Sequence, residues 1–321
     1  MKRVSVLVCS LVVALCMALA LAGCSSSSYT PESKSQTVNN SALKTSGTLR
    51  VGVNASNAPY AAESNGNIVG IDVDVAAALA DQMGLKLELV DVGSSADTAF
   101  SKENVDIVMG VTKSNSAYWM SDPYMTSAIA LFSLTKNATA PSASGSFTIA
   151  AQSSSMSAWE VTDHYGESCL KSSTDIQSAF ESLSTGSVNY VAVDSTIGEY
   201  VIHTSTITAY PIALLQEASS YSIAVSSSNT ALQTAVSEAL SQLKSGGIIS
   251  VVQSKWLGSQ PDISSLKVVT ATAQKESSAE EVTIVDSGTS STSSTSSNSS
   301  STSTGSSSSS SSSSNSKTTS N

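Results

Sequence analysis

The sequence predicts an α/β fold with largely parallel sheets, and two observations carry that prediction. Between residues 45 and 260, apolar runs typical of strands alternate with stretches of helical period, and this alternation is typical of α/β architecture. The same portion is long enough for one large domain or for two lobes of roughly 100 residues each. Ligands of such folds bind at the carboxyl ends of the strands, so we expect the binding site there.

The first predicted helix follows a strand at 49–53 and carries two carboxylates at its start. In the segment GIDVDVAAALADQMG (70–84), Asp72 precedes a helical period that begins at Val73. An aspartate at that position is typical of an N-cap, because it accepts hydrogen bonds from free backbone N–H groups and faces the positive end of the helix dipole. We therefore interpret Asp72 and Asp74 as residues that start the helix, rather than as paired catalytic acids or metal ligands.

The remaining elements follow the same alternation. Strands are predicted at 86–90, 106–110, 128–134, 147–151, 190–194 and 221–226. Helices are predicted near Ala96, around Trp159, over 174–183, from Ser195 towards His203, and from Asn229 onward. The last of these is the longest, with apolar residues at helical spacing at Leu232, Val236, Ala239, Leu240 and Leu243.

The first 24 residues have the form of an export signal. Lys2 and Arg3 precede an unbroken apolar run that ends in LALAGC, which is typical of a secretory signal peptide over residues 1–23. The final cysteine resembles that of a bacterial lipobox, which implies cleavage before Cys24 and lipid attachment to its thiol. The protein would then be lipid-anchored on the extracytoplasmic face of the cell membrane. An ordinary signal peptide or a membrane anchor is the alternative reading, and no later stretch is long and apolar enough to span a bilayer.

The two flanks of the predicted globular portion have the composition of flexible segments. Residues 24–44 are predicted to be a tether. Residues 261–321 are predicted to be a disordered tail, since from 287 onward the chain contains only Ser, Thr, Asn, Gly and one lysine. We interpret the tail as a solvated spacer; whether it is glycosylated or threads through a cell-wall layer stays open.

The positions of the four cysteines agree with an exported protein that forms no intrachain disulfide. Cys9 and Cys16 leave with the signal peptide and Cys24 would be acylated, so Cys169 remains alone and no intrachain disulfide is expected in the mature protein. A lone cysteine is more often a small buried hydrophobic residue than a reactive thiol.

The charge balance excludes some partners. The chain has 15 basic and 25 acidic residues, and loss of the two basic residues of the signal leaves 13 against 25, a net charge of −12. An acidic exported chain binds nucleic acid and anionic lipid poorly.

Conventional catalytic and metal-binding signatures are missing from the sequence. It contains no Gly-x-Ser-x-Gly, no Walker loop and no zinc-type cysteine pair. The two histidines, His164 and His203, have no metal-ligand partner at useful spacing, and the many serines have no base beside them that would make one a nucleophile. We predict neither a metal nor a cofactor.

Six segments occur in the order that resembles one family, the bacterial extracellular solute-binding proteins of family 3, which serve ABC importers of polar amino acids. These segments are GTLRVGVNASNAPY, GIDVDVAAALADQM, VDIVMGVT, SDPYMTS, YVAVDSTIGEYV and LKSGGIISVVQSKWLG. The second of them fits every position of the family signature. The resemblance covers residues 45–260, which is essentially the whole predicted globular portion.

The resemblance implies a two-lobed periplasmic-binding-protein type II fold with two crossing hinge strands and the ligand in the cleft between the lobes. We place the crossings at 128–134 and 221–226. Lobe 1 would comprise 45–132 plus 223–260, and lobe 2 would comprise 133–222. In this family the Asp-x-Asp segment belongs to the fold and does not contact the ligand.

Four ligand-binding positions carry over from the family onto this sequence. Tyr60 falls where the family stacks an aromatic ring on the ligand; a core or surface tyrosine is the alternative. Gly110 and Thr112 fall where backbone and hydroxyl groups hold the charged head of the ligand. Asp194 falls where an acid receives the ligand amine through a charge-assisted bond, although the same residue is also placed to cap the helix from Ser195.

The carboxylate-binding half of the family site is only partly retained. Ser154, Ser155 and Met156 replace the usual Gly-Thr-Thr of the turn that grips a carboxylate, so one hydroxyl is lost. The arginine that family members usually carry a few residues beyond Thr112 is missing, and Lys113 is the one nearby cation. A lysine ammonium lacks the planar fork that matches a carboxylate. We therefore expect either a weak carboxylate grip, through Lys113 and the serine turn, or a ligand without a free α-carboxylate.

These observations favour a monomeric, membrane-tethered receptor that captures a small amine-bearing solute, an amino acid or a derivative, and delivers it to an ABC permease. An enzyme on the same scaffold, such as the dehydratases that resemble this family, is a second hypothesis, for which Asp194 and Glu63 are the candidate acids or bases. A sensory or adhesive surface protein is a third, suggested only by the Ser-rich tail.

Overall fold

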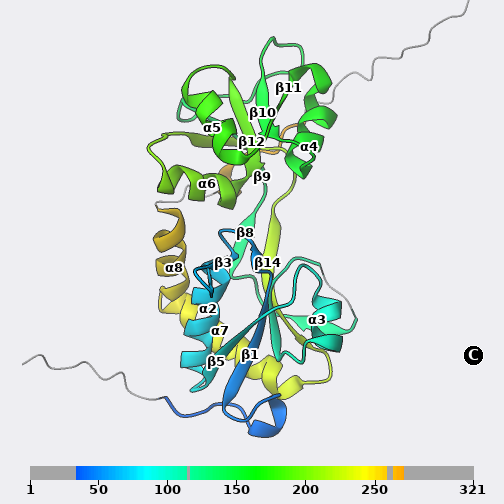
Figure 1. The fold of residues 1–321 in the computed structure, drawn as a ribbon, viewed down its shortest axis with the longest axis vertical. Helices are drawn as coiled ribbons and strands as arrows, with labels where there is room; N and C mark the ends of the chain where they lie inside the picture. The colour runs from blue at the N-terminus through cyan, green and yellow to red at the C-terminus, as the bar shows by residue number, and fades with distance from the viewer. Residues whose placement is uncertain (1–33, 114–115, 259–262, 271–321) are drawn as a thin grey trace, which may run out of the picture. The chain divides into compact units, whose positions relative to one another are not determined.

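The computed structural model describes residues 34–113, 116–258 and 263–270, whose strands form two larger sheets and one three-stranded sheet (Figure 1). The α-helices of the described part are α2 (Ile71–Gln82), α3 (Ala96–Lys102), α4 (Met156–Tyr165), α5 (Ile176–Ser184), α6 (Ser195–Thr204), α7 (Thr230–Ser245) and α8 (Ile248–Leu257). Short 3₁₀ turns cover Asn40–Ala42 (η1), Glu167–Cys169 (η2) and Ile263–Ser265 (η3). The predicted α/β class is confirmed.

The first sheet has the order β5-β1-β6-β14-β7, with β8 paired to β14. Its strands are β1 (Thr48–Val53), β5 (Lys86–Asp91), β6 (Ile107–Val111), β7 (Tyr118–Met120), β8 (Met125–Ser127) and β14 (Ser219–Ser226). Strand β1 runs parallel to β5 and β6, whereas β14 is antiparallel to β6, β7 and β8. The parallel strands agree with the prediction, and β7 and β8 were not expected from the sequence.

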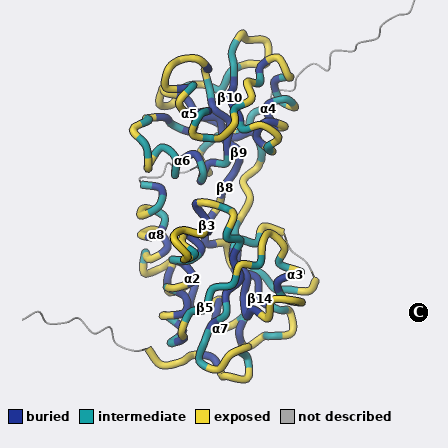
Figure 2. Tube along the Cα trace, viewed as in Figure 1, coloured by how far each residue is buried: buried dark blue, intermediate teal, exposed yellow. Residues whose placement is uncertain are grey.

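The second sheet has the order β11-β10-β12-β9-β13. Its strands are β9 (Ile129–Ser133), β10 (Ile149–Gln152), β11 (Leu170–Ser173), β12 (Tyr190–Asp194) and β13 (Tyr210–Leu214). Side chains alternate along β12, so that Val191 and Val193 pack with the core beside α5 and α6 while Ala192 packs with the core beside α4. Helices therefore cover both faces of this sheet, and the buried residues follow its strands (Figure 2).

The interpretation of Asp72 as an N-cap is wrong. Helix α2 begins at Ile71 rather than Val73, and its N-cap is Gly70, which makes no side-chain cap bond. The backbone carbonyls of Pro59 and Tyr60 instead accept the N–H groups of Ile71 and Asp72 at 3.0 and 2.9 Å. These carbonyls belong to the segment between β2 (Ser56–Asn57) and β3 (Ala61–Ser64), which pair with each other and with β4 (Asn67–Val69).

Gly70 permits this close approach of two backbone segments. Its φ is +148°, and a Cβ added there would lie 2.2 Å from the carbonyl oxygen of Tyr60. Only glycine fits this position. Because a distant backbone satisfies the start of α2, both carboxylates are free for other partners, and Asp74 accepts hydrogen bonds from Lys255 at 2.6 Å and from the indole of Trp256 at 2.7 Å.

The chain changes sheet at two points in the described part. It passes from β8, which ends at Ser127, to β9, which begins at Ile129, and it returns between β13 and β14. The predicted lobe boundaries, 132/133 and 222/223, therefore fall inside β9 and β14, a few residues after the chain has changed sheet.

Part of the predicted tail packs on the second sheet, which corrects the boundary at 261. The backbone of Leu214 on β13 pairs with Lys267 and Val269, and Ile263, Leu266 and Val268 pack against the core that includes α5. The apolar residues of 263–269 are half-buried, and these contacts distinguish the segment from the Ser-rich stretch that follows 287. The rest of the tail, the signal peptide, Cys24 and the tether as far as residue 33 lie outside the described residues.

The second half of the predicted tether, residues 34–44, packs on the first lobe instead, since Val38 is buried in its core and the N–H of Thr37 donates to the carbonyl of Met83 at 3.1 Å. The predicted tether boundary at residue 44 is therefore too late.

Within the described residues, no helix has the length and apolar character needed to cross a membrane. Cys169 is free and buried beside α4, as predicted for a small hydrophobic residue.

Candidate ligand-binding site

Most of the predicted site residues lie at the carboxyl ends of parallel strands, and Tyr60 lies between β2 and β3. Gly110 is near the end of β6, the turn before α4 follows β10, and Asp194 is the last residue of β12. Strands β10 and β12 are parallel, so the turn before α4 and Asp194 lie at the same edge of the second sheet. The chain arrives at this edge from the first sheet, because Ile129 pairs with Asp194.

Asp194 is held by donors from helix α6 and from the crossing segment. Its Oδ1 accepts the N–H groups of Thr196 at 3.0 Å and Ile197 at 3.2 Å, so it caps α6, and its Oδ2 accepts the hydroxyl of Ser127 at 2.8 Å. Burial raises the pKa of Asp194, and the bonds from Ser127 and from α6 oppose that rise. The helix-cap role left open by the sequence is thus present, and Oδ2 keeps room for a further donor.

Tyr60 connects this acid to the first lobe. Its hydroxyl donates to Asp194 Oδ1 at 3.4 Å, and its ring stacks on Tyr221 with 4.7 Å between centroids and 8° between planes. Tyr60 is 2% exposed. Burial, and after it the Asp194 carboxylate, raises the pKa of Tyr60 well above its usual value, so the phenol stays neutral.

Tyr221 was missed by the sequence reading, although it begins the crossing strand predicted at 221–226. Two residues apart along a strand lie on the same face, and Tyr221, Ile223 and Val225 all pack with the core of the first lobe. That alternation was the available signal for a tyrosine on the inner face.

A second buried carboxylate lies directly beneath Gly110. Tyr124 donates its hydroxyl to Asp72 Oδ1 at 2.6 Å. A Cβ added at Gly110, whose φ is +73°, would lie 3.1 Å from Asp72 Oδ2. Burial raises the pKa of Asp72 to about 6, and the bond from Tyr124 partly offsets this.

We call these six residues the Tyr–Asp cluster: Tyr60, Asp72, Tyr124, Ser127, Asp194 and Tyr221. Backbone bonds join its two halves, since the N–H of Asp72 donates to the carbonyl of Tyr60 at 2.9 Å and that of Tyr124 to the carbonyl of Tyr221 at 3.0 Å. The cluster combines two carboxylates with three aromatic rings, a chemistry that suits an ammonium group.

The other predicted residues lie in exposed segments. Thr112 and Lys113 follow β6 and are exposed, and the carbonyl of Lys113 accepts the hydroxyl of Tyr118 at 2.8 Å. Glu63, the second candidate acid of the enzyme hypothesis, is exposed on β3. Among the described residues, neither Lys113 nor Glu63 forms a hydrogen bond or ion pair with a member of the Tyr–Asp cluster.

The turn predicted to bind a carboxylate is here called the α4 turn (residues 153–159). Its Ser155 hydroxyl forms hydrogen bonds with backbone groups of this turn and of Gln152, which directly precedes it. Ser155 Oγ accepts the N–H of Ala158 at 3.1 Å and donates to the carbonyl of Gln152 at 2.7 Å. Ser154 has a φ of +56°, a conformation that favours glycine and agrees with the glycine of the family pattern. Met156 is 63% exposed.

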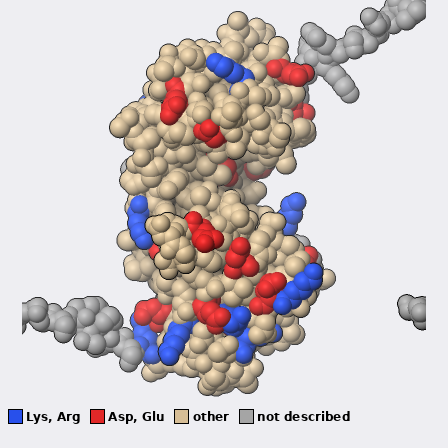
Figure 3. Space-filling model, in the orientation of Figure 1, with Lys and Arg blue, Asp and Glu red and all other residues tan. Residues whose placement is uncertain are grey.

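Arg50, the one arginine that follows the predicted signal, lies at the opposite end of the first sheet. It stands near the start of β1, and its guanidinium pairs with Glu88 and donates to the carbonyl of Asn104 at 2.9 Å. On the face seen in Figure 3, the Lys and Arg side chains are concentrated over the first lobe.

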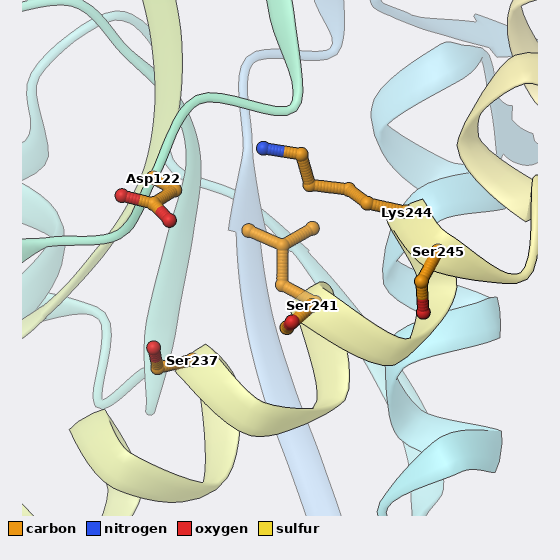
Figure 4. A pocket seen from close by; sticks show the side chains of 6 residues that line it. Asp122, Ser237, Ser241, Lys244 and Ser245 are labelled. Atoms are coloured by element: carbon orange, nitrogen blue, oxygen red, sulfur yellow. The ribbon is translucent and has the colours of Figure 1, made fainter.

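A separate hollow of about 250 Å³ lies on the first lobe between helix α7 and the loop at Asp122. Its lining combines polar side chains with Leu240, and Lys244 extends across it from α7 (Figure 4), donating to the carbonyl of Pro123 at 3.2 Å. None of the predicted ligand-binding residues lines this hollow.

The two-lobed α/β fold with its candidate site at strand ends defines a solute-binding protein. Residues 49–259 match the bacterial extracellular solute-binding proteins, family 3, and the chain belongs to that family. This confirms the resemblance drawn from the six segments. The search among curated proteins gave no match.

Solved structures support the type II fold. An ancestral cationic amino acid solute-binding protein, AncCDT-1, is 25% identical with a TM-score of 0.55, over 66% of this chain and 96% of its own. The second substrate-binding domain of GlnP from Lactococcus lactis, in an open conformation, is 23% identical with a TM-score of 0.56, over 67% and 97%. A polar amino acid uptake protein from Streptococcus thermophilus is 18% identical with a TM-score of 0.57, over 66% and 86%. The two-lobed fold is thereby confirmed.

Proposed function

We propose that this protein is a membrane-tethered receptor that captures a small amine-bearing solute between its lobes and delivers it to an ABC permease. The observation that carries the proposal is Asp194, a partly buried carboxylate held at a strand end by Ser127 and contacted by Tyr60 from the first lobe. A carboxylate fixed in this way accepts an ammonium without having to reorganise.

Lobe closure supplies the mechanism. Two crossing segments join the sheets, so the lobes can close over a ligand by small backbone changes at the crossings. Closure removes water from the Tyr–Asp cluster, which strengthens the bond between the ligand amine and Asp194.

The family and the name of its relative support this assignment. AncCDT-1 is described as a cationic amino acid solute-binding protein and shares the fold at 25% identity, which favours a positively charged ligand group here as well. We propose binding without chemistry, because Asp194 is engaged by donors on both oxygens and Glu63 is exposed.

Isothermal titration of the full chain against amino acids, short peptides and polyamines tests the receptor function. We expect at least one amine-bearing compound to bind with 1:1 stoichiometry. No binding across the whole panel would contradict the proposal.

The proposed anchor has its own test. If Cys24 carries lipid, Cys24→Ser should release the protein from the membrane fraction into the medium, since the described residues hold no membrane-spanning helix. Retention of the variant in the membrane would contradict the lipid anchor.

A further inference from the structure

We infer that the ligand of this site is an organic cation that carries no carboxylate group, such as a primary amine with an aromatic or aliphatic body. The inference rests on the proposed receptor function and specifies its ligand class. It follows from a contrast between the Tyr–Asp cluster and the α4 turn.

The Tyr–Asp cluster contains two carboxylates whose charges are not neutralised by the protein. In the described part of the chain, Asp194 accepts hydrogen bonds from the hydroxyls of Ser127 and Tyr60 and from two backbone N–H groups. Asp72 accepts its side-chain hydrogen bond there from Tyr124. None of these donors carries a charge. A ligand cation would supply the missing positive charge.

The charged groups that would receive a ligand carboxylate are engaged elsewhere. The guanidinium of Arg50 pairs with Glu88 at the far end of the first sheet. Lys255 pairs with Asp74 at 2.6 Å, and Lys244 donates to a backbone carbonyl. Lys113 is exposed and offers a point charge without a bidentate fork.

The α4 turn is poorly suited to a carboxylate as well. The hydroxyl of Ser155 is used by Ala158 and Gln152, and Ser153 donates to the carbonyl of Ser173 at 3.0 Å. Where the family pattern has a second threonine, Met156 presents an apolar side chain that is 63% exposed. A carboxylate placed here would lose solvent and gain only the first N–H groups of α4.

Apolar surface at the same sheet edge favours a ligand with an apolar body. Met156 and Trp159 lie three residues apart on one face of α4, and Trp159 is 58% exposed. The half-buried ring of Tyr221, which stacks on the buried Tyr60, adds aromatic surface on the first lobe. Exposed apolar side chains beside a binding edge are typical of ligand contact surfaces.

Matched pairs of ligands test the inference directly. The full chain is titrated calorimetrically with tyramine and tyrosine, phenethylamine and phenylalanine, cadaverine and lysine, and agmatine and arginine. Each pair differs only in the carboxylate. In the pair that binds best, we expect the amine to bind at least about tenfold more tightly than its amino acid, which corresponds to ~1.4 kcal/mol.

An amino acid that binds as tightly as its amine, or more tightly, would overturn the inference and leave the receptor function intact. Failure of every compound, together with the broad panel, would overturn both. A double variant, Lys113→Arg with Met156→Thr, supplies a guanidinium fork and a hydroxyl on the carboxylate side. We expect it to gain affinity for the amino acid and not for the amine, whereas equal gains for both would contradict the inference.

Discussion

The Tyr–Asp cluster and the α4 turn lie at the same kind of place, the carboxyl ends of strands, yet they are built in opposite ways. The cluster is buried and joins residues of both lobes through side-chain bonds, including the contact between Tyr60 and Asp194. The α4 turn is exposed at Ser153, Ser154, Met156 and Trp159, and Ser155 uses its hydroxyl to begin its own helix. The half of the proposed site that would receive an amine is therefore preorganised, and the half that the family resemblance assigns to a carboxylate is not.

If the proposed site is correct, this difference teaches that a family scaffold can keep its fold while one of its two recognition elements is lost. Preorganised charged partners give affinity because they cost little reorganisation on binding. A turn whose hydroxyls already serve the helix still completes the fold, since Ser155 caps α4 whether or not a ligand is present.

Replacing the acid of the cluster should give the largest effect. Asp194→Asn removes the negative charge and keeps an N-cap for α6, because asparagine caps helices as well as aspartate does. We expect amine affinity to fall by roughly 30- to 150-fold, the loss of about 2–3 kcal/mol for a charge-assisted bond. Calorimetric titration measures the affinity, and thermal melting checks that the variant is folded. A folded variant with unchanged affinity would contradict the role of Asp194.

Helix α6 also carries Glu199, a buried acid outside the Tyr–Asp cluster, which shows the effect of burial on a carboxylate that lacks the hydrogen bonds of Asp194. Glu199 is 8% exposed, and its Oε1 has no hydrogen-bond partner among the described residues. Burial raises the pKa of Glu199 from 4.5 to about 7. The folded protein therefore binds more protons than the unfolded chain between these pH values, and the contribution of Glu199 to stability falls as the pH rises through that window.

Glu199→Gln should remove that pH dependence and raise the free energy of unfolding at pH 8 by about 2 kcal/mol. Denaturant unfolding at pH 5 and pH 8 measures the change, with Glu181→Gln on the exposed face of α5 as the matched control. A variant that is equally stabilised at both pH values would show that the protonation of Glu199 is not involved.

The second carboxylate of the cluster should make amine binding depend on pH. Because the pKa of Asp72 is raised to about 6, this group loses its charge as the pH falls through that value. We expect amine affinity to fall severalfold between pH 7.5 and pH 5 and Asp72→Asn to flatten the profile. A profile that persists in Asp72→Asn would assign the pH dependence to another group, Asp194 first.

The smallest effect is expected for the hydroxyl that links the lobes. Tyr60→Phe keeps the stacking on Tyr221 and removes a 3.4 Å bond to Asp194. A bond of that length is weak, so we expect a two- to fivefold change in amine affinity, about 0.5–1 kcal/mol. Tyr221→Leu is the companion variant, because it removes the ring that stacks on Tyr60 and keeps the hydroxyl of Tyr60. A larger loss for Tyr60→Phe than for Asp194→Asn would reverse the ranking proposed here.

Much of the fold could be predicted from the sequence, because the apolar periods that define its strands and helices are local. The start of α2 could not, since the carbonyls of Pro59 and Tyr60 that satisfy it come from a distant turn. The packing of residues 263–269 likewise depends on β13, because Leu214 of that strand forms the backbone bonds that hold the segment. This strand lies about fifty residues earlier in the chain, so the segment itself gives no local signal.

Part of the Tyr–Asp cluster could be predicted. Asp194 and Tyr60 were singled out because each stands within a segment that resembles the family, and the structure joins them by a hydrogen bond, while their role in ligand binding stays a proposal. Asp72 was assigned to the start of its helix, and its partner Tyr124 was not considered, because a contact between residues 52 positions apart leaves no local signal.

The most direct test of the central claim, that recognition is led by the amine, is one titration experiment on two variants. Asp194→Asn and Lys113→Ala are titrated side by side with the best amine found for the wild-type chain, with Lys102→Ala on α3 as a surface control. The account expects affinity to be lost with Asp194→Asn and to stay within about threefold, less than 1 kcal/mol, with Lys113→Ala. Loss with Lys113→Ala but not with Asp194→Asn would contradict it.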